Sequence, residues 1–267
     1  MTSYYKYTKE PFIIAEVGSN WSGTTEAEIY DSCVKSCQIA QEYGANAVKF
    51  QMFTHEELYG KPGDNKHALP RSVAIGLAKY CELELEIEFM CSAFSVEGLR
   101  LIDPWVKRHK VASSKVGDIP FMAEIREIGK PALVSDGMFS VQGFSNIIPM
   151  VCASAYPAKL SDYSLANVAY YQSFENGWGL SDHNSGISLA KFFRANGCTY
   201  FEKHVNFVDA DSPDSELSFT AYMFGAYVDA IRLTKPGQPE VTKKNARDKW
   251  GDRWIDEVEG YFRPSGD

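Results

Sequence analysis

The fold is decided by the stretch WGLSDHNSGISLAKFFRANGCTYFEKHV, residues 178–205. A short apolar run at 178–181 is followed by a polar turn, a helical pattern at 187–196 and a second apolar run at 199–205. Two strands joined by such a helix form a right-handed parallel crossover. This stretch therefore predicts a strand–helix–strand unit with polar residues where each strand ends.

The same order of elements recurs along most of the chain. We predict strands at 12–17, 45–50, 86–91, 106–112, 131–135, 148–154, 178–181 and 199–205. We expect the helices after them at 26–43, 71–81, 96–102, 120–128, 141–147, 165–175, 187–196 and 219–233. Eight such units are typical of a (β/α)8 TIM barrel, which we predict for residues 1–234. A doubly wound open sheet is the alternative, but the G-x-G-x-x-G motif of its dinucleotide sites is absent.

Composition limits the classes of function. The chain has 267 residues, 45% of them hydrophobic, as is usual for a soluble globular protein. Its net charge of −8 disfavours nonspecific binding to nucleic acid or to anionic membranes. The N-terminus lacks the apolar core of a signal peptide, and no apolar run is long enough to span a membrane. The six scattered cysteines form no C-x-x-C pair, so we expect reduced thiols in a cytoplasmic protein.

Polar residues lie near the end of every predicted strand. They are Glu16, Lys49, Gln51, Ser92, Lys110, Ser113, Ser135, Asp136, Ser154, Ser181, Asp182, His183, Glu202 and His204. Packing does not account for them, because barrel interiors favour Val, Ile and Leu. Since active sites of such barrels lie at the C-terminal ends of the strands, we predict the site there.

Two histidines are placed to share a ligand. His183 and His204 end neighbouring strands, which lie roughly 4.8 Å apart, so both rings could reach one ion. Glu202 shares a strand face with His204, and the strand of Glu16 adjoins the last strand once the barrel closes. Two histidines beside carboxylates suit Mn, Fe, Co or Zn. Hydrogen-bonded core histidines are the alternative.

Lysines in the barrel mouth suggest an anion site. Lys49 shares a strand face with Gln51, and Lys110 occupies the equivalent position two strands further on. A lysine inside a barrel is costly unless it meets an anion. Together with serine hydroxyls, the two lysines could hold a phosphate or a carboxylate. The hydroxyls in question belong to Ser92, Ser113 and Ser181.

Two other interpretations of the lysines remain open. Lys49 and Lys110 could form structural ion pairs with Glu16 or Glu202. A Schiff-base aldolase would instead need one desolvated lysine, which could be Lys49, Lys110 or Lys203.

Several motifs together resemble the sialic acid synthase family, which includes N-acetylneuraminate, legionaminate and pseudaminate synthases. They are IAEVGSN (14–20), ANAVKFQ (45–51), KVAS (110–113), SDGM (135–138), SAYP (154–157), GLSDHNSG (179–186) and FEKH (201–204). The resemblance implies a (β/α)8 barrel. It also implies a metal-dependent condensation of phosphoenolpyruvate with the aldehyde of an N-acyl sugar similar to N-acetylmannosamine. The products would be a nonulosonic acid of the sialic type and phosphate.

The resemblance also assigns roles. It implies that His183 and His204 hold a divalent metal, typically Mn, with Mg, Co or Zn as alternatives, which polarises the aldehyde oxygen. Implied catalytic residues are Glu16, Lys49, Lys110 and Glu202. Implied substrate-binding residues are Gln51, Ser92, Ser113, Ser135, Ser154, Tyr156, Ser181, Asp182 and Asp214. The choice of sugar is expected to depend on loops 55–70 and 209–218.

The chain departs from the family pattern in several places, including the following three. Trp21 stands where the family has a histidine, and Lys115 stands where it has a glutamate. A tail at 235–267, expected to be helical, takes the place of the family's C-terminal antifreeze-like domain, which supplies an arginine to the partner subunit's sugar site. A homodimer or a separate partner could supply that domain. These departures leave two alternatives: a non-catalytic barrel that binds a sugar or phosphate, and a Schiff-base sugar-acid lyase.

Overall fold

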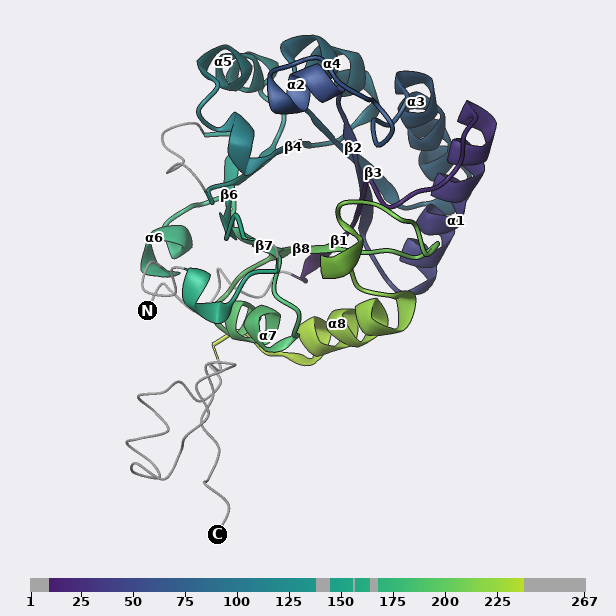
Figure 1. The fold of residues 1–267 in the computed structure, drawn as a ribbon. Coiled ribbons are helices and arrows are strands. Elements are labelled where there is room, and N and C mark those ends of the chain that lie inside the picture. The colour runs from purple at the N-terminus through teal and green to yellow at the C-terminus, as the bar shows by residue number, and fades with distance from the viewer. Residues whose placement is uncertain (1–9, 138–144, 156, 164–167, 238–267) are drawn as a thin grey trace.

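The computed structural model of the protein describes residues 10–137, 145–155, 157–163 and 168–237. Its eight strands pair in sequence order into a closed parallel barrel, as predicted (Figure 1). The strands are β1 Phe12–Gly18, β2 Ala47–Met52, β3 Glu88–Ala93, β4 His109–Val111, β5 Ala132–Ser135, β6 Ile147–Cys152, β7 Gly179–Asp182 and β8 Tyr200–His204.

Helices surround the barrel on its outside (Figure 1). They are α1 Glu26–Glu42, α2 His55–Tyr59, α3 Arg71–Tyr80, α4 Val96–Ile102, α5 Ile119–Ile128, α6 Val168–Gln172, α7 Ser188–Ala195 and α8 Ala221–Leu233. Among these, α2 was not predicted. The helix predicted at 141–147 lies mostly outside the described residues, and at its end it is wrong, because Ile147 begins β6. Most of the predicted helical tail, from residue 238 onward, also lies outside the described residues.

Local sequence signals explain where helices begin. Thr25 caps α1 by accepting a hydrogen bond from the backbone N–H of Glu28, whose side chain bonds back to the cap residue. Thr54 and Glu57 form the same reciprocal pair at the start of α2. This capping box satisfies backbone donors that a helix otherwise leaves unpaired. In α2 it stabilises a helix of five residues that has no buried side chain.

Alternation along the strands separates two apolar layers. On β2, Val48 and Phe50 point outward into the core beneath the surrounding helices. The inward layer at the lower end of the barrel is a small cluster of Ile14, Ala47, Met90, Leu133, Ile148 and Met150. Above this cluster the interior becomes polar, so the barrel can hold a polar ligand only toward the C-terminal ends of its strands.

A charged group closes the lower end of the barrel. Arg108 donates two hydrogen bonds to Glu88, at 2.7 and 3.1 Å. Its guanidinium also lies 4.3 Å from the ring centre of Phe12 and 5.8 Å from that of Tyr200. Arg108 therefore leaves the strand ladder, and β4 begins only at His109, three residues later than predicted. Among the described residues, no helix has both the length and the apolar character that crossing a membrane requires.

Candidate active site

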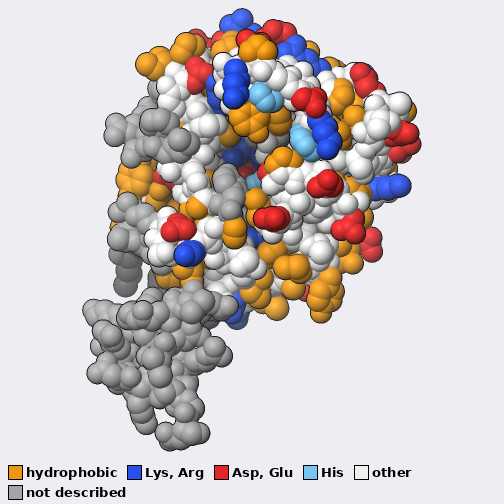
Figure 2. Space-filling model, in the orientation of Figure 1, with side chains coloured by type: hydrophobic (Ala, Val, Ile, Leu, Met, Phe, Trp, Pro, Cys, Tyr) orange, Lys and Arg blue, Asp and Glu red, His pale blue; other side chains and the backbone are white. Residues whose placement is uncertain are grey.

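A polar cavity of about 400 Å³ opens at the C-terminal ends of the strands. Figure 2 shows the hollow on this face of the molecule. The predicted site residues that line it are Glu16, Lys49, Gln51, Ser92, Lys110, Ser113, Ser135, Ser154, Ser181, His183, Glu202, His204 and Asp214. Of the other two, Tyr156 lies outside the described residues and Asp182 lies elsewhere. The barrel thus brings together residues from all eight strand ends or the loops that follow them.

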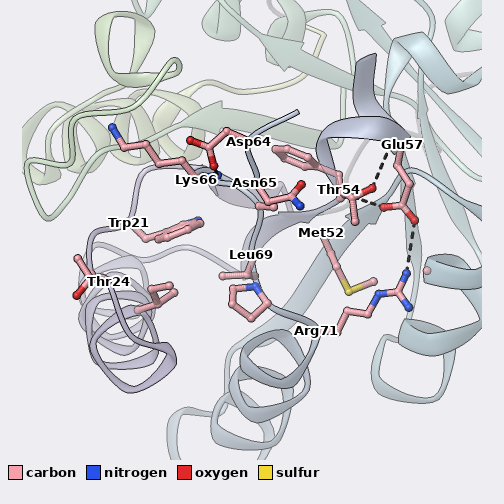
Figure 3. Close-up of a pocket in the computed structure, with 16 residues that line it drawn as sticks. Trp21, Thr24, Met52, Thr54, Glu57, Asp64, Asn65, Lys66, Leu69 and Arg71 are labelled. Atoms are coloured by element: carbon pink, nitrogen blue, oxygen red, sulfur yellow. Dashed lines mark hydrogen bonds and ion pairs between the residues drawn. The ribbon is translucent and has the colours of Figure 1, made fainter. Parts of the chain in front are cut away.

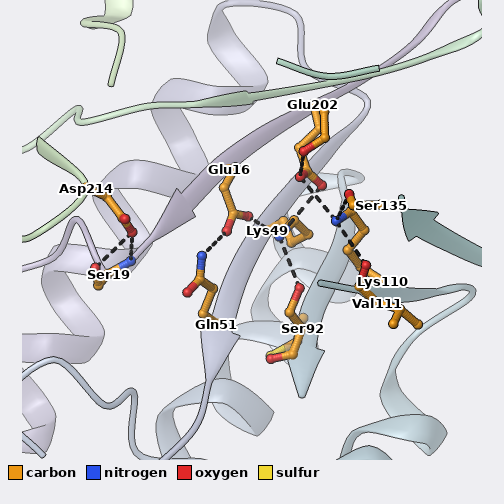
Figure 4. A network of polar contacts seen from close by, with 12 residues as sticks. Glu16, Ser19, Lys49, Gln51, Ser92, Lys110, Val111, Ser135, Glu202 and Asp214 are labelled. Carbon is orange, nitrogen blue, oxygen red and sulfur yellow. Dashed lines mark hydrogen bonds and ion pairs between the residues drawn. The ribbon is translucent and has the colours of Figure 1, made fainter. Parts of the chain in front are cut away.

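Buried charges form a network across the cavity (Figure 4). The Lys49 ammonium lies 2.6 Å from a carboxylate oxygen of Glu16 and 3.6 Å from one of Glu202. The Lys110 ammonium lies 3.4 Å from the other oxygen of Glu202 and donates to the Ser135 hydroxyl at 2.9 Å. The ion pairs considered as an alternative are therefore present, and the same lysines also line the cavity.

The network favours the charged forms of Glu202 and Lys49. Burial by itself would raise the pKa of Glu202, but the charges of Lys110 and Lys49 outweigh it and lower the pKa to about 2. Burial would lower the pKa of Lys49, yet the charges of Glu16 and Glu202 raise it above its ordinary value. A Schiff-base lysine must lose its proton before it attacks a carbonyl group. The surroundings of Lys49 oppose that loss.

His183 and His204 face one another, with ring centres 5.4 Å apart and planes inclined by 55°. Nδ1 of His183 lies 2.7 Å from the carbonyl oxygen of Ala153. Because a carbonyl only accepts, Nδ1 carries the hydrogen and Nε2 keeps a lone pair. Burial, together with the charge of His204, lowers the pKa of His183 to about 3. At neutral pH this ring is therefore a neutral imidazole, the form that binds a metal.

The donor set for a metal is small. In the part of the chain that the structure describes, no three His, Cys, Asp or Glu residues form a metal-binding group. The predicted metal would thus rely on His183 and His204, and would take its other ligands from water or substrate. The neutral state of His183 fits a divalent cation, and the metal itself stays a prediction.

The rim of the cavity carries hydrogen-bonding groups on the β1 side. Gln51 donates to the Glu16 carboxylate at 2.8 Å, and the Ser19 hydroxyl donates to Asp214 at 2.9 Å. Gly18 lies between these carboxylates with a φ of +58°, where a Cβ would stand 2.7 Å from Asp214. Only glycine adopts this backbone readily and leaves space for Asp214. Gly18 and Ser19 lie in the motif at 14–20 but were not predicted as site residues, although a Gly-Ser pair directly after a predicted strand is a turn signal.

The prediction that Asp182 contacts the substrate is wrong, because its side chain points away from the cavity. Its carboxylate is 1% exposed and lies outside the barrel wall, 3.4 Å from the ammonium of Lys203. Since neighbouring residues on a strand face opposite sides, Ser181 and His183 point into the cavity and Asp182 points away. Burial lowers the pKa of Lys203, as a Schiff-base lysine requires, but by the same alternation its side chain faces away from the cavity. Lys203 is therefore not a Schiff-base candidate.

Other residues lining the cavity were not singled out from the sequence. They are Leu58, Phe94, Ala112 and Ser114, and Cys152 at the end of β6 lines the cavity beside them. Burial raises the pKa of Cys152 to about 11, so it is a thiol at neutral pH. All six cysteines are free, as predicted. Lys115 pairs with Asp118 and lies 5.4 Å from the ring centre of Phe121, so the cation that replaces the expected glutamate does not line the cavity.

A second cavity, of about 730 Å³, is lined in part by residues of α2 and of the loop that follows it (Figure 3). Apolar side chains such as Trp21 and Leu69 line it together with polar ones such as Glu57 and Arg71. α2 contributes Leu58 to the first cavity and Glu57 to the second. Of the two loops that were expected to select the sugar, loop 55–70 thus lines the second cavity more than the first, whereas loop 209–218 contributes Asp214 to the first.

We predict that Asp136, next to the cavity, makes the protein less stable as pH rises. Burial raises its pKa to about 6, and a hydrogen bond from Tyr171 offsets only part of this effect. The folded state therefore holds the proton more tightly than the unfolded state. The resulting stability is complete below pH ~4 and is lost as pH rises through ~6, an effect of about 3 kcal/mol.

The variant Asp136→Asn tests this prediction, because it keeps the acceptor for Tyr171 and removes the charge. Urea unfolding at pH 4.5 and pH 7 should show a smaller difference for the variant, with a gain of about 1–3 kcal/mol at pH 7. Asp118→Asn is the matched control, since Lys115 lowers the pKa of that carboxyl and its removal should not help at pH 7. An unchanged pH dependence for Asp136→Asn would refute the assignment.

Comparisons with known proteins find a matching family model and several similar chains. The NeuB family model matches residues 36–240. A pseudaminic acid synthase of Campylobacter jejuni is 28% identical over 260 residues, which cover 84% of this chain and 74% of the relative. The human N-acetylneuraminate-9-phosphate synthase is 26% identical over 225 residues, 73% of this chain and 61% of that protein. The crystal structure of an N-acetylneuraminic acid synthetase from Leptospira borgpetersenii, solved with citrate, superposes with a TM-score of 0.75 at 23% identity and covers 90% of both chains.

Proposed function

The chain belongs to the NeuB family, and we propose that it is a phosphoenolpyruvate-dependent synthase of carbohydrate biosynthesis. In this reaction the chain condenses phosphoenolpyruvate with the open-chain aldehyde of an N-acyl sugar. The products are a nonulosonic acid and inorganic phosphate. Relatives named as pseudaminic, legionaminic and N-acetylneuraminate-9-phosphate synthases support this reaction class.

One observation carries the proposal: two buried lysines and two facing histidines share one small cavity. Lys49 and Lys110 lie beside the hydroxyls of Ser92 and Ser135, at 3.2 and 2.9 Å. An ammonium group and hydroxyl donors together suit a phosphate or a carboxylate, and phosphoenolpyruvate carries both groups. When the donor substrate binds, each lysine would contact both the donor and the carboxylate with which it is now paired.

The balance of charge supports a metal in the same cavity. Two lysines face two carboxylates, Glu16 and Glu202, so these four side chains have no net positive charge to offer a doubly anionic donor. A divalent cation held by the imidazoles of His183 and His204 would supply that charge. When bound, such an ion acts as a Lewis acid toward a carbonyl oxygen. Manganese is our first choice, and Mg, Co or Zn would satisfy the same argument.

The chain's own residues then position and protect the reacting groups. Lys49 and Lys110 hold the anionic donor with its enol carbon toward the rim. Gln51 and Asp214 at the rim provide hydrogen-bonding groups for sugar hydroxyls. A carbon–carbon bond forms between the enol carbon and the aldehyde carbon, and the aldehyde oxygen takes up a proton to become a hydroxyl. Water adds to the cation that results, and phosphate leaves with cleavage of its C–O bond as the keto group forms. Glu16, held by Lys49 and Gln51, is the carboxylate placed to take the proton from that water.

We expect turnover in a direct assay. The protein is incubated with MnCl2, phosphoenolpyruvate and N-acetylmannosamine or related N-acyl hexosamines, and released phosphate and 2-keto sugar acid are measured. Both products should appear in equal amounts and should disappear with EDTA or when mannose replaces the N-acyl sugar. If the folded protein forms neither product from any N-acyl sugar, the proposal fails and a non-catalytic binding barrel takes its place.

Three finer expectations remain predictions. They concern the identity of the sugar, a cytoplasmic location, and a homodimer or separate partner that supplies an arginine to the sugar site. None of them enters the reaction described above. Within the described residues, the cations that line the cavity are Lys49 and Lys110.

A further inference from the structure

A buried ion pair lies directly behind the two histidines. Asp182 on β7 and Lys203 on β8 are 1% and 0% exposed, and their charged atoms are 3.4 Å apart. The two residues are also register partners across the two strands. Elsewhere on these strands the outward positions hold apolar side chains, such as Leu180 and Phe201. Because well-packed apolar residues are often as stable as a buried ion pair, stability alone does not account for charges here.

The pair holds the backbone that follows His183. A carboxylate oxygen of Asp182 accepts a hydrogen bond from the Asn184 N–H at 2.8 Å, and Lys203 donates to the Asn184 carbonyl. The side chain of Asn184 donates to the carbonyl of Ala158 at 3.0 Å, and the Ala158 N–H donates back to the His183 carbonyl at 3.0 Å. Both backbone groups of Asn184 are thus held by the pair, one residue beyond His183.

The pair also reaches the backbone of His204. The Lys203 ammonium lies 4.1 Å from the ring centre of Phe219, a typical cation–π arrangement. The Phe219 N–H donates to the carbonyl of His204 at 2.8 Å. Lys203 therefore contacts Phe219, whose backbone pairs with the end of β8 at His204. Each member of the pair is next in sequence to one histidine.

We propose that Asp182 and Lys203 are positioning residues, which hold the ends of β7 and β8 so that His183 and His204 face one another across the cavity. The pair lies on the outer side of the barrel wall, whereas both rings line the cavity. It acts by preventing the two strand ends from shifting relative to one another. The role in metal binding rests on the proposed function, whereas the placement of the rings does not.

The double variant Asp182→Leu with Lys203→Met tests the role, because it replaces the ion pair with apolar groups of similar size and leaves no buried charge unpaired. We expect a melting temperature near that of the wild type. We also expect the Kd for Mn²⁺, measured by calorimetry on metal-free protein, to rise about 10–100-fold, as is usual when supporting contacts of metal ligands are lost. The control Phe201→Leu, in the same outer layer, should lower the melting temperature and leave the Kd unchanged.

A second measurement does not depend on a metal. In protein labelled with ¹⁵N-histidine, the ring signals of His183 and His204 should shift or broaden in the double variant. Those of the other three histidines should not change. A double variant with wild-type Kd and wild-type ring signals would overturn the proposal. If the double variant does not fold, Asp182→Asn replaces it, and the same two measurements decide. If the wild type binds no Mn²⁺, the metal proposal fails, and the ring signals still decide whether the pair positions the histidines.

Discussion

Replacing Lys110 with methionine is expected to lower kcat/KM for phosphoenolpyruvate by about 10³-fold, which corresponds to ~4 kcal/mol of transition-state stabilisation. The substitution removes the cation that holds the donor, while the side chain keeps nearly the same length. Glu202 retains Lys49 at 3.6 Å, so its carboxylate is not left without a counter-charge. We therefore expect the loss of stability to stay below the 3–5 kcal/mol typical of breaking an isolated buried pair.

Lys115→Met is the matched control for this experiment. Lys115 is five residues further along the chain and carries the same charge, but it pairs with Asp118 and does not line the cavity. Its replacement should leave kcat and KM within about twofold, in line with the small effects of most surface substitutions. Equal effects of the two substitutions would contradict the assigned role, because net charge rather than position would then explain the loss.

The second large effect is expected for the histidines. His183→Ala and His204→Ala should each weaken Mn²⁺ binding by about 100-fold or more, since each removes half of the protein's donor set. Turnover should fall by about 10³-fold and should return only in part at high Mn²⁺ concentration. Calorimetry measures the affinity, and release of phosphate measures turnover.

His109→Asn separates this effect from a general loss of buried histidine. His109 is 1% exposed and its Nε2 lies 2.9 Å from Asp103, but it precedes Lys110 on β4 and so faces away from the cavity. Its replacement should lower stability and leave Mn²⁺ affinity unchanged. If His183→Ala leaves both Mn²⁺ affinity and turnover intact, the two rings are core histidines, and the proposed metal has no site.

Most of the barrel could be predicted from the sequence because apolar residues recur at different spacings in strands and in helices. The order of eight units sufficed, and the closed topology then places Glu16 beside His204 as expected. Helix α2 was not predicted, because it has no buried side chain and its sequence shows no regular spacing of apolar residues. Its capping pair, Thr54 and Glu57, was nevertheless visible as a T-x-x-E pattern.

The sequence predicted which residues lie at the cavity better than it predicted which way each side chain points. Asp182 was assigned to the cavity because it ends a strand, although the alternation that correctly paired Glu202 with His204 would have placed it on the outer side. The sharing of Glu202 between two lysines could not be predicted. It depends on how far each strand is offset from the next when the barrel closes, and the sequence pattern does not contain that offset.

The arginine that covers the lower end of the barrel has a consequence for kinetics. With Arg108 packed on Phe12 and Tyr200, and an apolar cluster above them, the interior is a blind tube with its mouth at one end. The lysines lie deeper in this tube than the partly exposed Gln51 and Asp214. Under the proposed function, we therefore expect the donor to enter before the sugar and the most deeply bound product to leave last. A cavity that is open only at one end would thus impose an order of substrate addition without any conformational change.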